Sequence, residues 1–501
     1  MALMTRRNFL ASPPAALAQM AAKPDILWIM LDQLRYDCLG ANGNRLIRTP
    51  NLDRLAARSA NFSHAFVQSP VCVPSRVSSF TGRYPHSHKN RVNYTPCDSR
   101  EVFLQQLLGG EGYQTGAVGK LHYYPPTREH ALTMGWDTVQ LDDGVGSTDR
   151  FSDYVRWRKA QDPRASIPYH ATVPGAKNPF RGAIAYEHTP TAWTGMRTRE
   201  TLRAMARDRR PFFLYSSFFK PHAPHTVPEP YDSMYDDVEI PLPASVTIEE
   251  IRRLPAPVQK QILRGRPQYG MERERLQWIY RSYYASVSML DREIGLILDE
   301  LEQSGRATNT IIVISTDHGD QLLEHGLEGK NLFWEASVQA PLLICWPRRI
   351  LARTYEELIE MVDLAPTLLE LAGAPVPVNM QGRSFAALVT GGAGYAARTE
   401  VFAENIIPEV INSMGMFYER GQGVGGVRHP DAKMVRTRRW KLNYYVGNGG
   451  ELYDLEQDPG ETRNLYGDPE HQELVRDLKG KVLDWMITAD ETDQIAPRWL
   501  L

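Results

Sequence analysis

Residues 26–33 read Ile-Leu-Trp-Ile-Met-Leu-Asp-Gln, an apolar run that ends in an acid and an amide. Short apolar runs separated by helical patterns are typical of a mostly parallel sheet covered by helices. The sequence therefore predicts an α/β fold with one large mixed, mostly parallel sheet flanked by helices. The expected strands are Ile26–Leu31, Gln114–Val118, Pro211–Phe218, Thr310–Ser315 and Pro341–Cys345.

Helix signals lie between these runs. Thr49-Pro50 supplies a cap and a first-turn proline, and Asp98 with Glu101 resembles a capping box before an apolar segment. A long helix is expected from about Glu272 to Gln303, because apolar residues recur there at helical spacing. Gly305 follows and is expected to end it.

The chain divides into three predicted parts. Residues 1–23 are expected to be a signal segment, 24–390 a catalytic α/β domain, and 391–501 a smaller C-terminal α+β subdomain. Within the last part, antiparallel strands are expected at Val435–Tyr445 and Glu451–Leu455, and a closing helix at His471–Met486.

Two regions of weak periodicity interrupt the catalytic part. Residues 141–210 and 224–270 are rich in proline, glycine, arginine and polar residues. We interpret both as long insertions, which in α/β enzymes usually shape substrate access.

The composition is that of an ordinary globular chain. Its 501 residues are 42% hydrophobic and 23% charged, with a formal net charge of −2. This charge argues against a nucleic-acid partner. The four cysteines form no disulfide framework or CxxC pair, and no apolar run is long enough to span a membrane.

The N-terminus carries a possible export signal. Thr5–Leu10 resembles the twin-arginine signature, and an alanine-rich stretch that ends at Ala18 follows it. Pro13-Pro14 interrupts the short apolar segment, so an unstructured basic N-terminus is the alternative. We expect a periplasmic or secreted protein.

Polar residues follow four of the predicted strands. Because ligands of open α/β sheets bind beyond the carboxyl ends of the strands, these side chains are expected to meet at one edge. They are Asp32-Gln33, Lys120 and His122, His222, and Asp317-His318.

A second cluster begins at Cys72. The segment reads Cys72-Val-Pro-Ser-Arg76, and Pro74 is suited to the first turn of a helix. Cys72 is therefore expected near a helix N-terminus, where amide groups favour an anion. With three residues between Cys72 and Arg76, the segment is not the Cys-x5-Arg loop of cysteine phosphatases.

These motifs together resemble the type I sulfatases of the alkaline-phosphatase superfamily. In that family the cysteine of CxPxR is oxidised by a formylglycine-generating enzyme to formylglycine, whose hydrate is the nucleophile. The resemblance covers nearly all of the chain after residue 24. Its further segments are Thr49–Asp53, Thr81–Arg83, Gly119–His122, Pro221–Pro224, Thr316–Asp320, Gly326–Lys330 and Glu451–Leu455.

The resemblance implies a role for each residue. Arg76, Lys120 and Lys330 would offset charge, His222 would serve the leaving group, and His122 would be the base that breaks down the sulfated intermediate. His225 and His325 compete with His222, and Asn93 would donate to the sulfuryl group. The implied metal ligands are Asp32, Gln33, the matured Cys72, Asp317 and His318.

Two of these ligands depart from the common family pattern. Many members have aspartate at the position of Gln33 and asparagine at that of His318. Calcium, usual in the family, prefers oxygen ligands, whereas an imidazole makes manganese an alternative.

Three functions remain open at this point. The first is a sulfatase for a small sulfated carbohydrate, choline sulfate or aryl sulfate. The second is a formylglycine-dependent phosphonate monoester or phosphodiester hydrolase, because those relatives share the Asp-Gln and Asp-His pairs. They often lack the Gly-Lys-x-His segment present at 119–122, which favours the sulfatase. The third is a non-catalytic protein that binds sulfated glycans.

Overall fold

The computed structural model describes residues 23–93, 95–144, 148–164, 171–264, 272–406 and 431–490. The predicted signal segment therefore falls outside the described residues, apart from Lys23. Among the described residues, no helix has both the length and the apolar character needed to cross a membrane.

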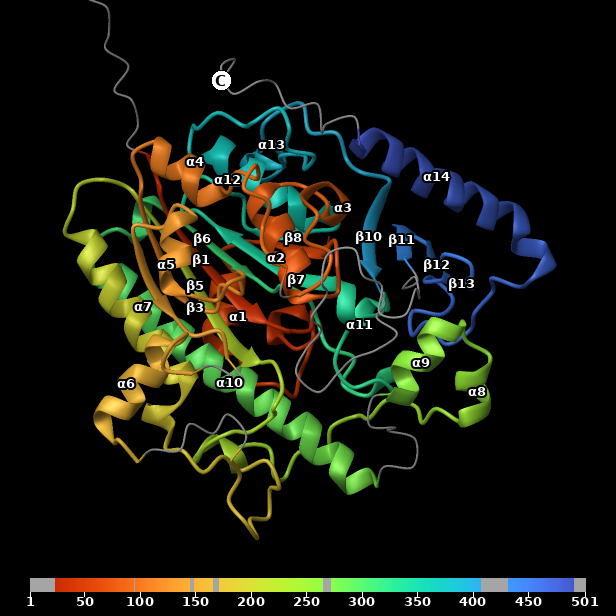
Figure 1. Ribbon diagram of the computed structural model, residues 1–501, viewed down its shortest axis with the longest axis horizontal. Coiled ribbons are helices and arrows are strands. Elements are labelled where there is room, and N and C mark those ends of the chain that lie inside the picture. The colour runs from red at the N-terminus through yellow and green to blue at the C-terminus, as the bar shows by residue number, and fades with distance from the viewer. Residues whose placement is uncertain are drawn as a thin grey trace, which may run out of the picture.

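A large sheet forms the centre of the molecule (Figure 1). Its described strands run in the order β4-β3-β5-β1-β6-β7-β2-β8, and β9 also pairs with β2. They are β1 (Asp25–Asp32), β2 (Ala60–Phe66), β3 (Gln114–Gly119), β4 (Thr138–Leu141), β5 (Phe212–Pro221), β6 (Thr310–Ser315), β7 (Gln339–Cys345), β8 (Arg353–Tyr355) and β9 (Ile359–Glu360).

The sheet is mixed. Strands β4, β3, β5, β1 and β6 are mutually parallel, whereas β7 is antiparallel to both β6 and β2. The five strands predicted from the sequence are all present, and the predicted α/β class is confirmed.

Helices cover both faces of this sheet. Alternate residues of β1 enter two separate cores: Trp28 belongs to the core that includes residues of α2 and α4, and Ile29 to the core that includes residues of α1, α7 and α10. The helices of the α/β part are α1 (Pro50–Ala56), α2 (Cys72–Thr81), α3 (Pro85–His88), α4 (Leu104–Gly110), α5 (Arg128–Thr133), α6 (Asp153–Gln161), α7 (Pro190–Ala206), α8 (Ile248–Arg252), α9 (Ala256–Arg264), α10 (Arg273–Gln303), α11 (Glu335–Val338), α12 (Leu364–Leu371) and α13 (Ala386–Thr390).

The long helix α10 matches its predicted bounds, and Gly305 follows it with a φ of 74°. The capping-box prediction was wrong. Helix α4 begins at Leu104, and Gln106 caps the backbone N–H of Phe103, whereas Asp98 belongs to a separate turn.

The interpretation of 141–210 as a long insertion of weak periodicity was also wrong in part. Helix α7 lies there and packs against α10, β5 and β3. The two helices are in close contact, since a Cβ on Gly195 would lie 1.9 Å from a carboxylate oxygen of Glu293 on α10. A helix held in place by such tertiary contacts needs little periodicity of its own.

The C-terminal part has its own antiparallel sheet, in the order β10-β11-β12-β13, and α14 packs on it. The range 435–445, predicted to be strand, contains the turn of a hairpin. These elements are β10 (Glu400–Ile406), β11 (Asp431–Thr437), β12 (Trp440–Tyr445), β13 (Gly449–Asp454) and α14 (Gln472–Asp490).

Candidate active site

The parallel strands deliver the predicted polar residues to one edge of the sheet. Asp32 is the last residue of β1, Lys120 directly follows β3, and Asp317 comes just after β6. His222 follows β5, and its backbone N–H donates to the carbonyl of Asp32 at 3.1 Å. Cys72 is the first residue of α2, at the helix N-terminus as the sequence predicted.

Cys72 is buried and surrounded by cationic side chains. Its Sγ lies 2.9 Å from Lys330 Nζ, 3.2 Å from His318 Nε2 and 4.0 Å from Lys120 Nζ. Burial by itself raises the pKa of the Cys72 thiol, but the two lysines and a hydrogen bond from His122 bring that pKa well below its ordinary value. The position therefore stabilises a negative charge.

One group among the described residues could hold a metal ion. Ligand atoms of Asp32, Cys72, Asp317 and His318 all lie within 4.8 Å of one another, and all four side chains are buried. Oδ1 of Asp32 has no hydrogen-bond partner in the described part of the chain. A buried carboxylate oxygen without a donor fits a cation-binding position.

Arg76 contacts both acidic residues of the site, Asp32 and Asp317. Its Nε donates to Asp317 Oδ2 at 2.8 Å, and its Nη2 lies 3.3 Å from Asp32 Oδ2. Its Nη1 donates to Ser217 Oγ at 2.9 Å and Tyr215 Oη at 3.1 Å. Because Arg76 is fully buried and every donor group is used, it orients the carboxylates rather than reaching into solvent.

Gln33 lies between a lysine and an acid. Its backbone adopts a φ of 68°, and its N–H donates to Asp317 Oδ1 at 3.1 Å. The side-chain oxygen accepts from Lys330 Nζ at 3.0 Å, and the side-chain nitrogen donates to Asp320 Oδ2 at 2.5 Å. The amide oxygen therefore faces the same side as Cys72.

Of the three candidate histidines, His222, His225 and His325, it is His222 that lies in this centre. Burial lowers its pKa and Lys330 lowers it further, whereas Asp32 raises it. The two competitors have other surroundings: His225 lies between Phe180 and Tyr283, and His325 stacks on Trp334.

His122 and Asn93 complete the predicted set. The backbone N–H of His122 donates to Asp143 Oδ1 at 2.9 Å, in a left-handed turn with a φ of 59°. Asn93 Oδ1 accepts from the backbone N–H of Val73 at 3.0 Å, directly beside Cys72. The fold thus brings all eleven residues of the predicted site to one centre.

Sequence reasoning missed the residues that support this centre. Asp320 orients Gln33, Ser217 and Tyr215 hold Arg76, and the ring of Phe219 lies 4.9 Å from that of His222. Asp320 was detectable, because it stands in the Thr316–Asp320 motif. The others lie inside strand β5, where nothing in a buried run distinguishes them.

Comparison with known proteins identifies the family. Residues 24–374 match the family Sulfatase, and residues 323–487 match the C-terminal region of N-sulphoglucosamine sulphohydrolase. The chain belongs to the sulfatase family. It is a sulfuric ester hydrolase, as the sequence predicted, and the non-catalytic alternative has no support.

The relatives of this sulfatase span nearly its whole length. An arylsulfatase of Clostridium perfringens is 30% identical over 92% of this chain and 95% of its own. The multifunctional alkaline phosphatase superfamily protein PehA of Trinickia caryophylli is 28% identical over 94% and 96%. A phosphonate monoester hydrolase of Agrobacterium radiobacter shares the fold, with a TM-score of 0.80 and 24% identity over 93% of this chain and 96% of that one.

Proposed function

We propose that this sulfatase acts through a formylglycine made from Cys72, beside a bound divalent cation. The observation that carries the proposal is the set of cationic groups within 4.0 Å of Cys72 Sγ: Lys330, His318 and Lys120. Such surroundings suit both an anionic nucleophile and the anionic sulfuryl group.

The cation would be held by Asp32, Gln33, Asp317, His318 and the matured Cys72. When bound, it would fix a sulfate oxygen and favour ionisation of one hydroxyl of the hydrated formylglycine. The carboxylate and amide oxygens favour Ca²⁺, and the imidazole makes Mn²⁺ the alternative. The metal content of the purified protein distinguishes them.

Hydrated formylglycine at position 72 would react in two steps. One hydroxyl, ionised beside the cation, would attack sulfur; the bond between sulfur and the ester oxygen would break, the departing oxygen would take a proton from His222, and a sulfated residue 72 would remain. His122 then takes the proton of the second hydroxyl, so that sulfate leaves and the aldehyde is restored. Arg76, Lys120 and Lys330 offset charge, and the side-chain nitrogen of Asn93 donates to the sulfuryl group.

His222 would protonate the departing oxygen. Its Nδ1 donates to the carbonyl of Ala223 at 2.6 Å, so Nε2 carries a proton only in the imidazolium form. Burial and Lys330 lower the pKa of His222 in the free site. The negative charge of a bound sulfate ester opposes this effect and favours the imidazolium.

A phosphonate monoester or phosphodiester hydrolase is the second candidate. It is favoured by the Gln33 and His318 pair, whereas the Gly119–His122 segment favours sulfate. The same nitrophenyl leaving group offered as sulfate, phosphodiester and phosphonate separates the two. We expect the highest kcat/KM for the sulfate, and a higher value for the phosphonate would contradict the main proposal.

Maturation of Cys72 has a direct test. The protein is produced with and without a formylglycine-generating enzyme, and the proteolytic peptide that contains Cys72 is weighed. We expect the aldehyde or its hydrate, together with activity, only when that enzyme is present. An unmodified thiol in active protein would exclude the proposed nucleophile, and Cys72→Ala serves as the inactive control.

We also propose that the chain is exported through the twin-arginine signature at Thr5–Leu10 and acts on small sulfated carbohydrates, choline sulfate or aryl sulfates. The double variant Arg6→Lys and Arg7→Lys should leave the enzyme in the cytoplasm. Unchanged periplasmic activity in cell fractions would exclude this route.

A further inference from the structure

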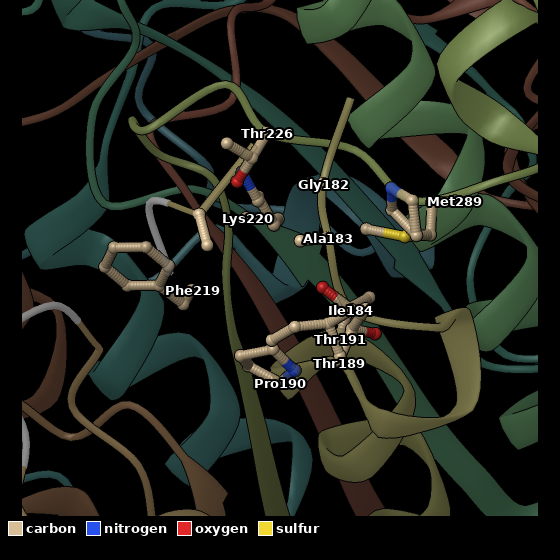
Figure 2. Close-up of a pocket in the computed structure, with 12 residues that line it drawn as sticks. Gly182, Ala183, Ile184, Thr189, Pro190, Thr191, Phe219, Lys220, Thr226 and Met289 are labelled. Atoms are coloured by element: carbon tan, nitrogen blue, oxygen red, sulfur yellow. The ribbon is translucent and has the colours of Figure 1, made fainter. Parts of the chain in front are cut away.

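A buried lysine without a counter-ion lies next to the candidate site. Lys220 is 8% exposed and lines a small cavity of about 40 Å³ (Figure 2). The cavity is walled mainly by apolar groups, among them Ile184, Pro190, Phe219 and Met289. In the described part of the chain, burial alone shifts the pKa of Lys220, and no carboxylate offsets it.

Placing an ammonium in such surroundings is unfavourable. Burial lowers the pKa of Lys220 from 10.5 to about 7, so an uncharged amine is well populated at neutral pH. The position of Lys220 therefore needs another explanation. The hydrogen bond that its amine donates offers one.

The amine of Lys220 donates to the carbonyl of Pro224, four residues along the chain. The segment between them contains Pro221 as well, and neither proline has an N–H to donate. Pro224 is half-buried, and the side chain of Lys220 gives its carbonyl a hydrogen-bond donor. The contact closes residues 220–224 into a loop.

His222 lies at the centre of that loop. Its backbone N–H donates to the carbonyl of Asp32, its Nδ1 donates to the carbonyl of Ala223, and its ring packs on Phe219. The Ala223 carbonyl belongs to the peptide unit that joins Ala223 to Pro224. Any shift of Pro224 therefore turns the group that fixes the imidazole.

We propose that Lys220 is a positioning residue, whose amine clamps the Pro224 carbonyl and thereby holds the His222 imidazole toward the leaving group of the ester. The inference rests on the role proposed above for His222. It adds a residue outside the metal and sulfuryl-binding set, in a cavity that Phe219 also lines.

The test uses leaving groups of different quality. A nitrophenyl sulfate needs little protonation of its departing oxygen, whereas an alkyl sulfate needs much. His222→Ala should lower kcat for the alkyl sulfate about 100-fold more than for the aryl sulfate, since general acids contribute on the order of 10²–10⁴-fold. Lys220→Met, which keeps the length but lacks the donor, should show the same bias at roughly 10-fold.

The matched control is Met289→Leu, which alters the same cavity without touching the loop. It should show no bias between the two esters. In the double variant of Lys220→Met with His222→Ala, the alkyl-to-aryl ratio should equal that of His222→Ala alone. If Lys220→Met lowers both rates equally, or neither, while His222→Ala keeps its bias, the positioning role is excluded.

A second measurement does not depend on the leaving group. In protein with ¹⁵N-labelled histidine, the ring nitrogens report which one carries the proton. We expect His222 to be fixed in the Nδ1–H form in the parent and to become a mixture in Lys220→Met. A fixed Nδ1–H form in the variant overturns the inference. If His222→Ala itself shows no bias between the alkyl and aryl sulfates, only the proposed role of His222 is overturned.

Discussion

The side-chain amide of Gln33 has its orientation set by a single carboxylate. Asp320 only accepts hydrogen bonds: one oxygen takes the Gln33 amide nitrogen at 2.5 Å, and the other takes the N–H groups of Leu322 and Gly329. The Gln33 oxygen must then point to Lys330 and the cation ligands. An aspartate at position 33 would set two acids against each other, so Gln33 and Asp320 are compatible as a pair.

Asp320→Asn should therefore weaken metal binding. An asparagine can donate as well as accept, and it leaves Gln33 free to turn its nitrogen toward the cation. We expect metal affinity to fall about 10- to 100-fold in calorimetric titration of chelator-treated protein. The double variant Gln33→Glu with Asp320→Asn exchanges the two groups and should recover part of the affinity. Unchanged affinity in Asp320→Asn would refute the argument.

His88 makes the stability of the helix that carries Cys72 dependent on pH. Its Nδ1 accepts from the N–H of Asn90 at 3.1 Å, its Nε2 lies 3.0 Å from Ser78 Oγ, and burial lowers its pKa from 6.5 to about 3. Below pH 6.5, His88 is protonated in the unfolded chain but stays neutral in the folded chain. The corresponding stability is present above pH 6.5 and is lost as the pH falls to about 3.

His88→Asn should reduce this acid sensitivity. The asparagine oxygen still accepts from Asn90 and does not titrate. Between pH 6.5 and 3, we expect the free energy of unfolding to fall less in the variant than in the parent. The difference between the two falls should be at most roughly 4–5 kcal/mol. Urea unfolding at a series of pH values measures it. An equal fall in unfolding free energy at acid pH in parent and variant would contradict this effect of His88.

The end of strand β3 lies close against β5 just before Lys120. Gly119 has a φ of 90°, and a Cβ there would lie 2.0 Å from the backbone oxygen of Ser217. The N–H of Lys120 donates to that same oxygen at 2.9 Å. A glycine is thus required for the strand end to deliver Lys120 to Cys72.

Gly119→Ala should separate the two strands and displace Lys120. We expect a loss of about 3 kcal/mol in unfolding free energy and a large fall in kcat. Gly116→Ala, in the same strand, is the control, because a Cβ there meets side chains and no backbone atom: the flexible end of Met205 at 2.6 Å and the methyl of Thr138 at 3.2 Å. Equal effects of the two variants in thermal unfolding and steady-state kinetics would exclude this explanation.

The two sheets of the molecule are joined by a buried ion cluster. Lys441 on β12 is fully buried and lies 3.0 Å from Glu335 at the start of α11 and 2.8 Å from Glu461. Burial raises the pKa of Glu461 to about 7, which Lys441 opposes. The C-terminal sheet is therefore held to the catalytic part by charge as well as by apolar contact.

Lys441→Met should leave the buried Glu461 without its cation, whereas Glu335 keeps Arg436 at 3.3 Å. Removing one partner of a buried pair costs about 3–5 kcal/mol, and we expect that loss in denaturant unfolding. Adding Glu461→Gln should recover part of it, because one uncompensated charge disappears. A loss below about 1 kcal/mol would mean that the cluster does not join the two sheets.

The sequence alone determined the parallel strands and the residues at their ends. Apolar runs such as Ile26–Leu31 are long enough to be recognised, and a polar residue at a strand end stands out against them. The CxPxR segment indicated the proposed nucleophile in the same way, because its residue types and spacing are local. Helix α10 was predictable from periodicity over many turns.

Only the tertiary structure decided the contacts that orient those residues. Helix α7 is placed by α10 and β5, and the donors that hold Arg76 come from a strand distant in the chain. Asp320 and Lys220 act through one hydrogen bond each, on Gln33 and on Pro224. Local sequence encodes which groups are available, but their orientation depends on contacts between distant segments that form only in the folded chain.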